Sequence, residues 1–294
     1  MRQSFLRRTI WLCLTASFYL AAPAAAAAQD LRYFSAEYRI YAGGILLSKV
    51  EVQLDVSPKT YRVSAHIAPA GLGHIASNSH VVATSYGELE AGQFVPTHLD
   101  LSWANDDGIS ASSMRYRDGA PVEFISGYTR PPNAQSDSQV DINSIGKGTT
   151  DPFVAMLAPL KTDKLIDACH GEQQIFDGRR HATLTLLAGR EIAPSEHDYP
   201  SQIAALSCQV LWTPIAGYSR RSLERAAEFP PVEAHYGRIA DTRFAAPLEM
   251  RGETRFGAVS IYAVQFFTET KVQNQPFDIA DYAYDLEPEE RDDD

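Results

Sequence analysis

The chain has 294 residues, of which 45% are hydrophobic, and its 26 basic and 37 acidic residues give a net charge of −11. That length suffices for one sizeable β domain or two small ones, and the acidic balance argues against nucleic acid and anionic membrane surfaces as partners.

Residues 1–28 predict a cleaved signal peptide. Arginines, including Arg7 and Arg8, precede an apolar run at 10–22, and residues 26–28 are alanines. The strongly apolar part is shorter than the roughly 20 residues of a membrane-spanning helix. We therefore expect cleavage near the last of these alanines and a mature protein in the periplasm of a Gram-negative envelope, without a membrane span. The paired arginines leave both the general secretory route and the twin-arginine route open.

The first half of the mature chain predicts a meander of antiparallel strands. Gly43 and Gly44 form a turn before segment 49–56, where Val50 and every second residue after it are apolar and share one face. The strands that we expect here lie at 36–42, 49–56, 61–67, 81–89, 98–103 and 113–116.

One short helix is predicted between the two halves. Asp151 is a suitable cap, Pro152 suits the first helical position, and an apolar run at 153–158 follows before Pro159. A second short helix is expected at 222–227, beside the basic cluster of Arg220, Arg221 and Arg225, which we interpret as a solvated face.

The second half again predicts strands. The pair Asp177-Gly178 indicates a hairpin whose two turn positions both favour positive φ. The expected strands lie at 173–176, 179–187, 205–212, 232–236, 247–251 and 256–268. The last of them has apolar residues on both faces, so one face needs cover from a helix, a sheet or a ligand.

These elements predict a single all-β domain over residues 29–280. Its sheet is antiparallel and strongly curved, an open or spiral β-barrel with the helix after Asp151 plugging it. Residues 281–294 are almost entirely acidic and polar, and we expect them to form a disordered tail.

The cysteines predict one disulfide. Cys13 falls in the signal peptide, which leaves Cys169 and Cys208 as an even pair in an exported chain. The chain has no C-x-x-C motif, so the bridge is expected to be structural rather than redox-active.

No catalytic residue, metal site or cofactor is predicted. Residues 146–150 resemble part of a phosphate-binding loop, but Asp141 stands at the first glycine position and Gly148 follows the lysine. No serine lies in a G-x-S-x-G elbow. The candidates that we weighed and set aside are three histidines for a metal and two carboxylate pairs for glycoside hydrolysis: His66, His74 and His80, Asp106 with Asp107, and Glu88 with Glu90.

Several segments together resemble a bacterial family. They are residues 174–180 with Cys169 before them, Cys208 followed by residues 214–218, the turn at Gly43, and the segment that starts at Asp151. Over residues 35–270 the chain resembles the family catalogued as domain of unknown function 3108. The resemblance implies an exported envelope protein with a β fold and no assigned activity, and it transfers no catalytic residue. More distantly, the chain is similar to periplasmic proteins with curved β-sheets, some of which carry lipoproteins.

The sequence thus favours a non-enzymatic envelope protein that binds an amphiphile, a lipid or a partner protein in the concave face of its sheet. One alternative is a structural or interaction module for envelope integrity, with a filled core and no cavity. Another is a hydrolase of cell-wall or glycan material, which rests only on scattered carboxylates. The sequence does not identify the ligand-binding residues.

Overall fold

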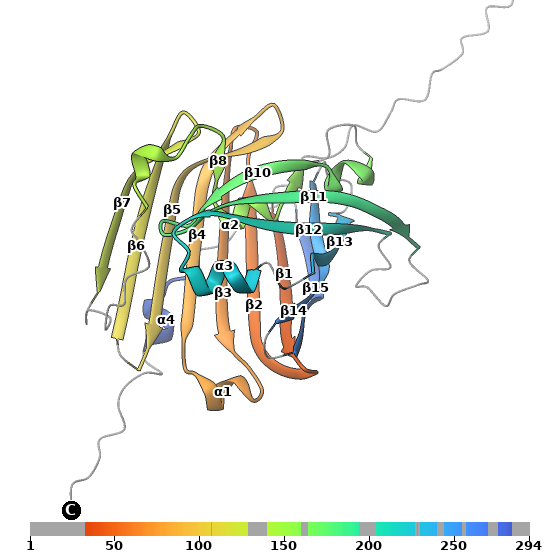
Figure 1. Cartoon of the computed structure of the whole chain (residues 1–294), viewed down its shortest axis with the longest axis horizontal. Helices are drawn as coiled ribbons and strands as arrows, with labels where there is room; N and C mark the ends of the chain where they lie inside the picture. The colour runs from red at the N-terminus through yellow and green to blue at the C-terminus, as the bar shows by residue number, and fades with distance from the viewer. Residues whose placement is uncertain are drawn as a thin grey trace, which may run out of the picture.

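In a computed structural model, the chain forms one large β-sheet that curls into a nearly closed barrel (Figure 1). The structure describes residues 33–106, 108–128, 140–159, 164–193, 204–226, 228, 230–239, 244–254, 257–269 and 276–283. The predicted signal peptide, with Cys13, lies outside them. The strands of the first half are β1 (Tyr33–Ala42), β2 (Ile45–Val56), β3 (Thr60–Pro69), β4 (His80–Glu90), β5 (Gln93–Asn105), β6 (Gly108–Arg117) and β7 (Ala120–Tyr128).

The second half adds β8 (Thr149–Thr150), β9 (Ala158–Pro159), β10 (Gly171–Phe176), β11 (His181–Ile192), β12 (Ala205–Ala216), β13 (Val232–Arg238), β14 (Phe244–Thr254) and β15 (Gly257–Glu269). The short helices are α1 (Gly73–Ala76), η1 (Ile142–Ser144), α2 (Pro152–Ala155), η2 (Leu165–Cys169), α3 (Arg220–Ala226) and α4 (Ala280–Ala283).

Within the described residues, fifteen strands form a single sheet in the order β7-β6-β5-β4-β3-β2-β1-β15-β14-β13-β12-β11-β10-β8, and β9 pairs with β14. The first and last long strands, β1 and β15, pair in the middle. The two ends approach each other where the amides of Gly148 and Thr149 donate to the Gly119 carbonyl, at 2.7 and 3.2 Å. The predicted barrel-like sheet is confirmed, with one exception to its antiparallel pairing, since β8 runs parallel to β10.

The predicted helix, α2, plugs the barrel. Asp151 accepts hydrogen bonds from the amides of Phe153 and Val154, as expected of a cap. Val154 and Leu157 are buried in the cluster that contains Phe34 and Leu54, while neighbouring residues of the helix contact the two other large clusters. The helix therefore joins the walls of the barrel through its interior.

A β-bulge explains the two apolar faces of β15. Between Glu37 and Tyr38 the β1–β15 register shifts, so the inward-facing position moves from Ala263 to Phe266. Phe266 packs on Phe34 with ring centroids 5.4 Å apart, whereas Phe267 is 55% exposed. The apolar residues on both faces are explained because the alternation changes phase within the strand, so that a single face of β15 packs inside the barrel.

The two predicted turns differ in geometry. Ala42 pairs with Ile45, and the two glycines between them both have positive φ, 57° and 82°. The β10–β11 hairpin is also present, but its loop has four residues because Phe176 pairs with His181. Of this loop only Gly178 has positive φ, since Asp177 instead accepts hydrogen bonds from two following amides. The prediction of positive φ at both positions was wrong.

The C-terminal segment folds back on the outer face of the sheet. The amide of Phe277 donates to Ser64 Oγ at 3.3 Å, and the Tyr282 ring stacks on His66 with centroids 3.6 Å apart. Residues 281–283, which we expected in the disordered tail, are therefore helical, and Tyr282 packs against β3. Residues 284–294 lie outside the described part of the chain.

Candidate functional site

The predicted disulfide is present. Cys169, at the end of η2, is bonded to Cys208 on β12, and their Cα atoms lie 5.4 Å apart. Both residues are buried in one hydrophobic cluster with Leu206 and Tyr236. A bridge across 39 residues of sequence is expected to stabilise the fold by about 4 kcal/mol. It also fixes η2 against the sheet, and η2 contributes to the wall of the cavity described below.

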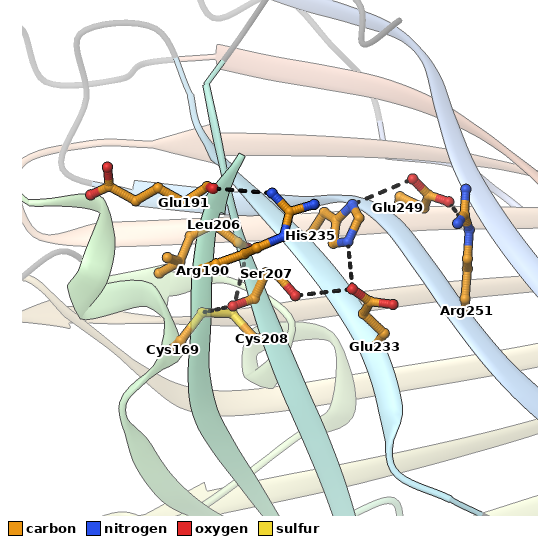
Figure 2. Close-up of polar contacts among 10 residues, drawn as sticks. All are labelled: Cys169, Arg190, Glu191, Leu206, Ser207, Cys208, Glu233, His235, Glu249 and Arg251. Carbon is orange, nitrogen blue, oxygen red and sulfur yellow. Dashed lines mark hydrogen bonds and ion pairs between the residues drawn. A yellow bond between two sulfur atoms is a disulfide. The ribbon is translucent and has the colours of Figure 1, made fainter. Parts of the chain in front are cut away.

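On the other face of the same strands, polar side chains surround His235 (Figure 2). His235 Nε2 lies 3.0 Å from Glu233 Oε1, and its Nδ1 lies 3.4 Å from Glu249 Oε2. Ser207 Oγ donates to Glu233 at 3.0 Å, and Arg251 forms an ion pair with Glu249. We call these five residues the His235 network.

Electrostatics favour a charged imidazole in this network. Burial alone would lower the pKa of His235, but its hydrogen bonds to Glu249 and Glu233 outweigh burial and raise the pKa. The same hydrogen bond from His235 lowers the pKa of Glu233. Ser207 donates to a carboxylate rather than to the imidazole, so the network does not provide the serine–histidine pair of an activated nucleophile. Its geometry suits a pH-dependent structural role.

A cavity of about 760 Å³ lies at one end of the barrel. It is bounded by the turns β4–β5 and β6–β7 on one side, and by η2, β8 and the start of β10 on another. Its volume falls within the usual range for ligand pockets, about 300–1,000 Å³. The cavity is the clearest candidate for a binding site among the described residues.

The cavity has an apolar floor and an acidic rim. Buried apolar side chains from four elements or their flanks line it, namely Phe94, Val154, Leu157 and Leu186. Exposed acidic residues also line it, namely Glu88, Glu90, Asp118 and Glu172, with Arg117 as an exposed basic neighbour. A ligand with an apolar body and a polar or positively charged part would complement this lining.

Asp151 anchors the helix from which part of the floor comes. Its carboxylate is fully buried, with Oδ1 2.9 Å and 3.0 Å from the amides of Phe153 and Val154. Ser85 Oγ donates to Oδ2 at 2.7 Å, which ties the helix to β4. Burial raises the pKa of Asp151, and these hydrogen bonds partly offset that effect. The position of Val154 and Leu157 in the floor therefore depends on one buried carboxyl group.

Some of the candidates that the sequence suggested meet in this cavity. Glu88 and Glu90 both line it, as do Gly148, Thr149 and Thr150 from the segment that resembled part of a phosphate loop. Asp106 lies in the β5–β6 turn, outside the cavity, and Asp107 lies outside the described residues. The basic cluster lies on α3, where Arg220 pairs with Glu224.

The three histidines do not form a metal site. His66 Nε2 lies 3.1 Å from His80 Nδ1, but His74 lies on α1, and no group of three metal-ligating residues occurs in the part of the chain that the structure describes. Burial, and then the neighbouring His80, lowers the pKa of His66 to about 4. The two imidazole rings stack against the Tyr282 ring, with centroids 3.6 and 5.5 Å from it.

The cavity was not predicted from the sequence. Its lining comes from residues between 88 and 186 that no single motif unites. The sequence feature most closely related to the cavity was the predicted helix after Asp151, because this helix lies inside the curved sheet and supplies Val154 to the cavity lining. Neither the acidic rim nor the His235 network could be assembled without the strand order.

None of the helices in the described residues has the length and apolar character needed to cross a bilayer. No family model and no curated protein matches the chain. Among solved structures, the chain is similar to a beta-barrel-like protein of domain of unknown function DUF1849 from Brucella abortus, with a TM-score of 0.46 and 12% identity over 82% of this chain and 99% of that one. This is a likeness of fold alone, and membership of the family 3108 stays a prediction.

Proposed function

We propose that this protein is a non-enzymatic binding protein of the periplasm, which holds a ligand with an apolar body in the cavity at the end of the barrel. The observation that carries the proposal is the cavity itself, a space of about 760 Å³ with an apolar floor and a polar rim. Most ligand pockets combine these features, with apolar contacts for affinity and a few polar groups for orientation. An amphiphile, a lipid or a segment of a protein would each fit this description.

Binding of the apolar fluorescent probe 1-N-phenylnaphthylamine tests the proposal. Gln173 lines the cavity, whereas its neighbour Gln174 does not, and both are half-buried residues of β10. The wild-type protein should bind the probe, Gln173→Trp should weaken binding by about tenfold or more by filling the cavity, and Gln174→Trp should leave it unchanged. Absence of binding, or equal losses in both variants, would contradict the proposal.

Native mass spectrometry of protein taken from its own periplasm would then identify the natural ligand. A bound mass that leaves on denaturation would give its composition. The Gln173→Trp variant should carry less of it than the Gln174→Trp variant.

The cavity also bears on the two alternatives. It favours a binding protein over an interaction module with a filled core. For a hydrolase, one carboxyl group should lie in the apolar surroundings that turn it into a general acid. Of the acidic residues that line the cavity, Glu88, Glu90, Asp118 and Glu172 are exposed and Asp167 is half-buried. Since none of them is fully buried, we favour binding over hydrolysis.

A further inference from the structure

The sheet splits beside the cavity. The β5–β6 ladder begins at His98, opposite Arg115, whereas β5 itself begins at Gln93. Both adjoining hairpins change register at this level, β4–β5 between Tyr86 and Gly87, and β6–β7 directly after Arg115. Because bulges bend strands, β6 leaves the side of β5 here and continues with β7 alone.

The split exposes a strand edge to the cavity. Residues 93–96 of β5 pair with β4 on one side, and on the other side residues 93–97 have no ladder partner among the described residues. All five of these residues line the cavity. A strand edge presents backbone N–H and C=O groups that can pair with an added strand, and here Pro96 offers only its C=O while the other four residues offer both groups.

A second, shorter edge borders the same cavity. Residues 171–173 of β10 also line it, and within the described part of the chain they pair with β11 alone, because β8 joins β10 only at Gln174 and Ile175. The chain before β8 is drawn away from β10 by the hydrogen bond from Gly148 to the Gly119 carbonyl. The cavity is therefore bordered by two segments of unpaired sheet edge.

The side chains around these edges indicate what an added strand would carry. Successive residues of a strand point to opposite faces. Apolar residues at every second position could thus contact the floor at Phe94 and Leu157, while the intervening residues face the rim at Glu90 and Glu172. Because exposed acidic residues predominate at this rim, basic side chains complement it.

We propose that the cavity takes an extended polypeptide segment in which apolar and basic residues alternate, and that this segment adds as a strand to the edge of β5 at residues 93–97. The inference rests on the proposed function, since it names the ligand class of the same cavity. Main-chain hydrogen bonds provide affinity in this mode of recognition, and the alternate side chains provide specificity.

Three labelled peptides of about eight residues, a common strand length, test the inference by fluorescence anisotropy. One alternates lysine with valine, the second alternates glutamate with valine, and the third repeats the lysine peptide with N-methyl groups on alternate residues along one edge. The lysine peptide should bind, and more weakly as salt increases. The other two should each bind about tenfold more weakly or worse.

Matched variants and hydrogen exchange locate the site. Glu90→Gln combined with Glu172→Gln should weaken binding of the lysine peptide, whereas Glu191→Gln combined with Glu253→Gln, outside the cavity, should not. Bound peptide should slow amide exchange at residues 93–95 and 97, since Pro96 has no amide hydrogen. Protection at β7 instead, or equal affinity of the lysine peptide and its N-methylated version, would overturn strand addition at β5.

A cationic amphiphile separates this inference from the proposed function. If dodecyltrimethylammonium displaces 1-N-phenylnaphthylamine while none of the peptides binds, the polypeptide inference is overturned and the proposed function stands. If neither the probe nor any peptide binds, both are overturned. Equal binding of the lysine and glutamate peptides would refute the role of the acidic rim.

Discussion

Replacing Asp151 tests what holds α2 inside the barrel. The carboxylate is fully buried and accepts three hydrogen bonds, two from the first amides of the helix and one from Ser85 on β4. Alanine at this position would leave the amides of Phe153 and Val154 without this acceptor, and Ser85 Oγ would keep only its contact with Tyr61 Oη at 3.4 Å. We therefore expect a large loss of stability from Asp151→Ala.

The magnitude follows from these contacts. Loss of a helix cap costs about 1 kcal/mol, and loss of a hydrogen bond to a charged group about 1.5–3 kcal/mol, with a further penalty for the unpaired donors. Alanine also removes a buried carboxyl group whose ionised form is disfavoured by burial, as the raised pKa of Asp151 indicates. This change offsets part of the loss in the free energy of unfolding. The net expectation for Asp151→Ala is a loss of about 3 kcal/mol in the free energy of unfolding at neutral pH.

Asp151→Asn is the matched control. Asparagine caps helices as well as aspartate does, and its amide can donate to the Ser85 hydroxyl, so its loss should stay within about 1 kcal/mol. The folded protein holds the Asp151 proton more tightly than the unfolded chain. The wild type should therefore lose stability as the pH rises above the ordinary value of 3.8, and Asp151→Asn should lack this contribution.

Urea unfolding of the oxidised protein, followed by circular dichroism at several pH values, measures both effects. The slope of free energy against urea should be the same in all variants, so that midpoints report stability directly. A loss below about 1 kcal/mol for Asp151→Ala, or equal losses for the alanine and asparagine variants, would refute the role assigned to the three hydrogen bonds.

Three further predictions concern other parts of the molecule. Replacing both Cys169 and Cys208 with alanine should lower the free energy of unfolding by about 4 kcal/mol, measured with urea, and weaken binding of 1-N-phenylnaphthylamine because η2 loses its anchor. Since the pKa of His235 is raised above 6.5, the wild type should lose stability as the pH rises from 6.5, and His235→Gln should flatten that slope between pH 6 and 9. Phe266→Ala should cost about 2–3 kcal/mol and Phe267→Ala less than about 0.5 kcal/mol in urea, and equal costs would contradict the bulge in β15.

Local signals in the sequence predicted the parts of the fold that depend on local physics. The cap at Asp151 and Pro152 identified α2, because capping and a fixed φ act within one turn. Alternation of apolar residues identified most strands of the sheet, since one face of each packs in the barrel. The parity of the cysteines identified the bridge between Cys169 and Cys208 without any knowledge of the strand order.

The missed features depend on neighbours that are distant in sequence. Strand β7 was not predicted, because Pro121 and Gly127 interrupt its pattern. Proline is tolerated there since β7 stands at one end of the strand order, where one edge needs no amide. The bulge that exposes Phe267, and the return of Tyr282 onto His66, likewise follow from pairing that no short window of sequence contains.

The cavity depends both on features that local sequence predicted, the disulfide and the Asp151 cap, and on the strand order, which it did not predict. Binding should therefore respond to reduction of the disulfide and should in turn stabilise the fold. One wall is fixed covalently, since the Cys169–Cys208 bridge holds η2, while the floor is fixed through Asp151. Among the described residues, positions 93–96 of β5 pair only with β4 and end in an unpaired edge, while Phe94 packs on Tyr61 and Phe244. A strand bound at that edge would extend this wall, and because such a ligand binds the folded protein, it should stabilise the fold by about 2.7 kcal/mol at a concentration one hundred times its Kd. Reduction of the bridge should weaken binding, because η2 is then no longer held covalently against β12.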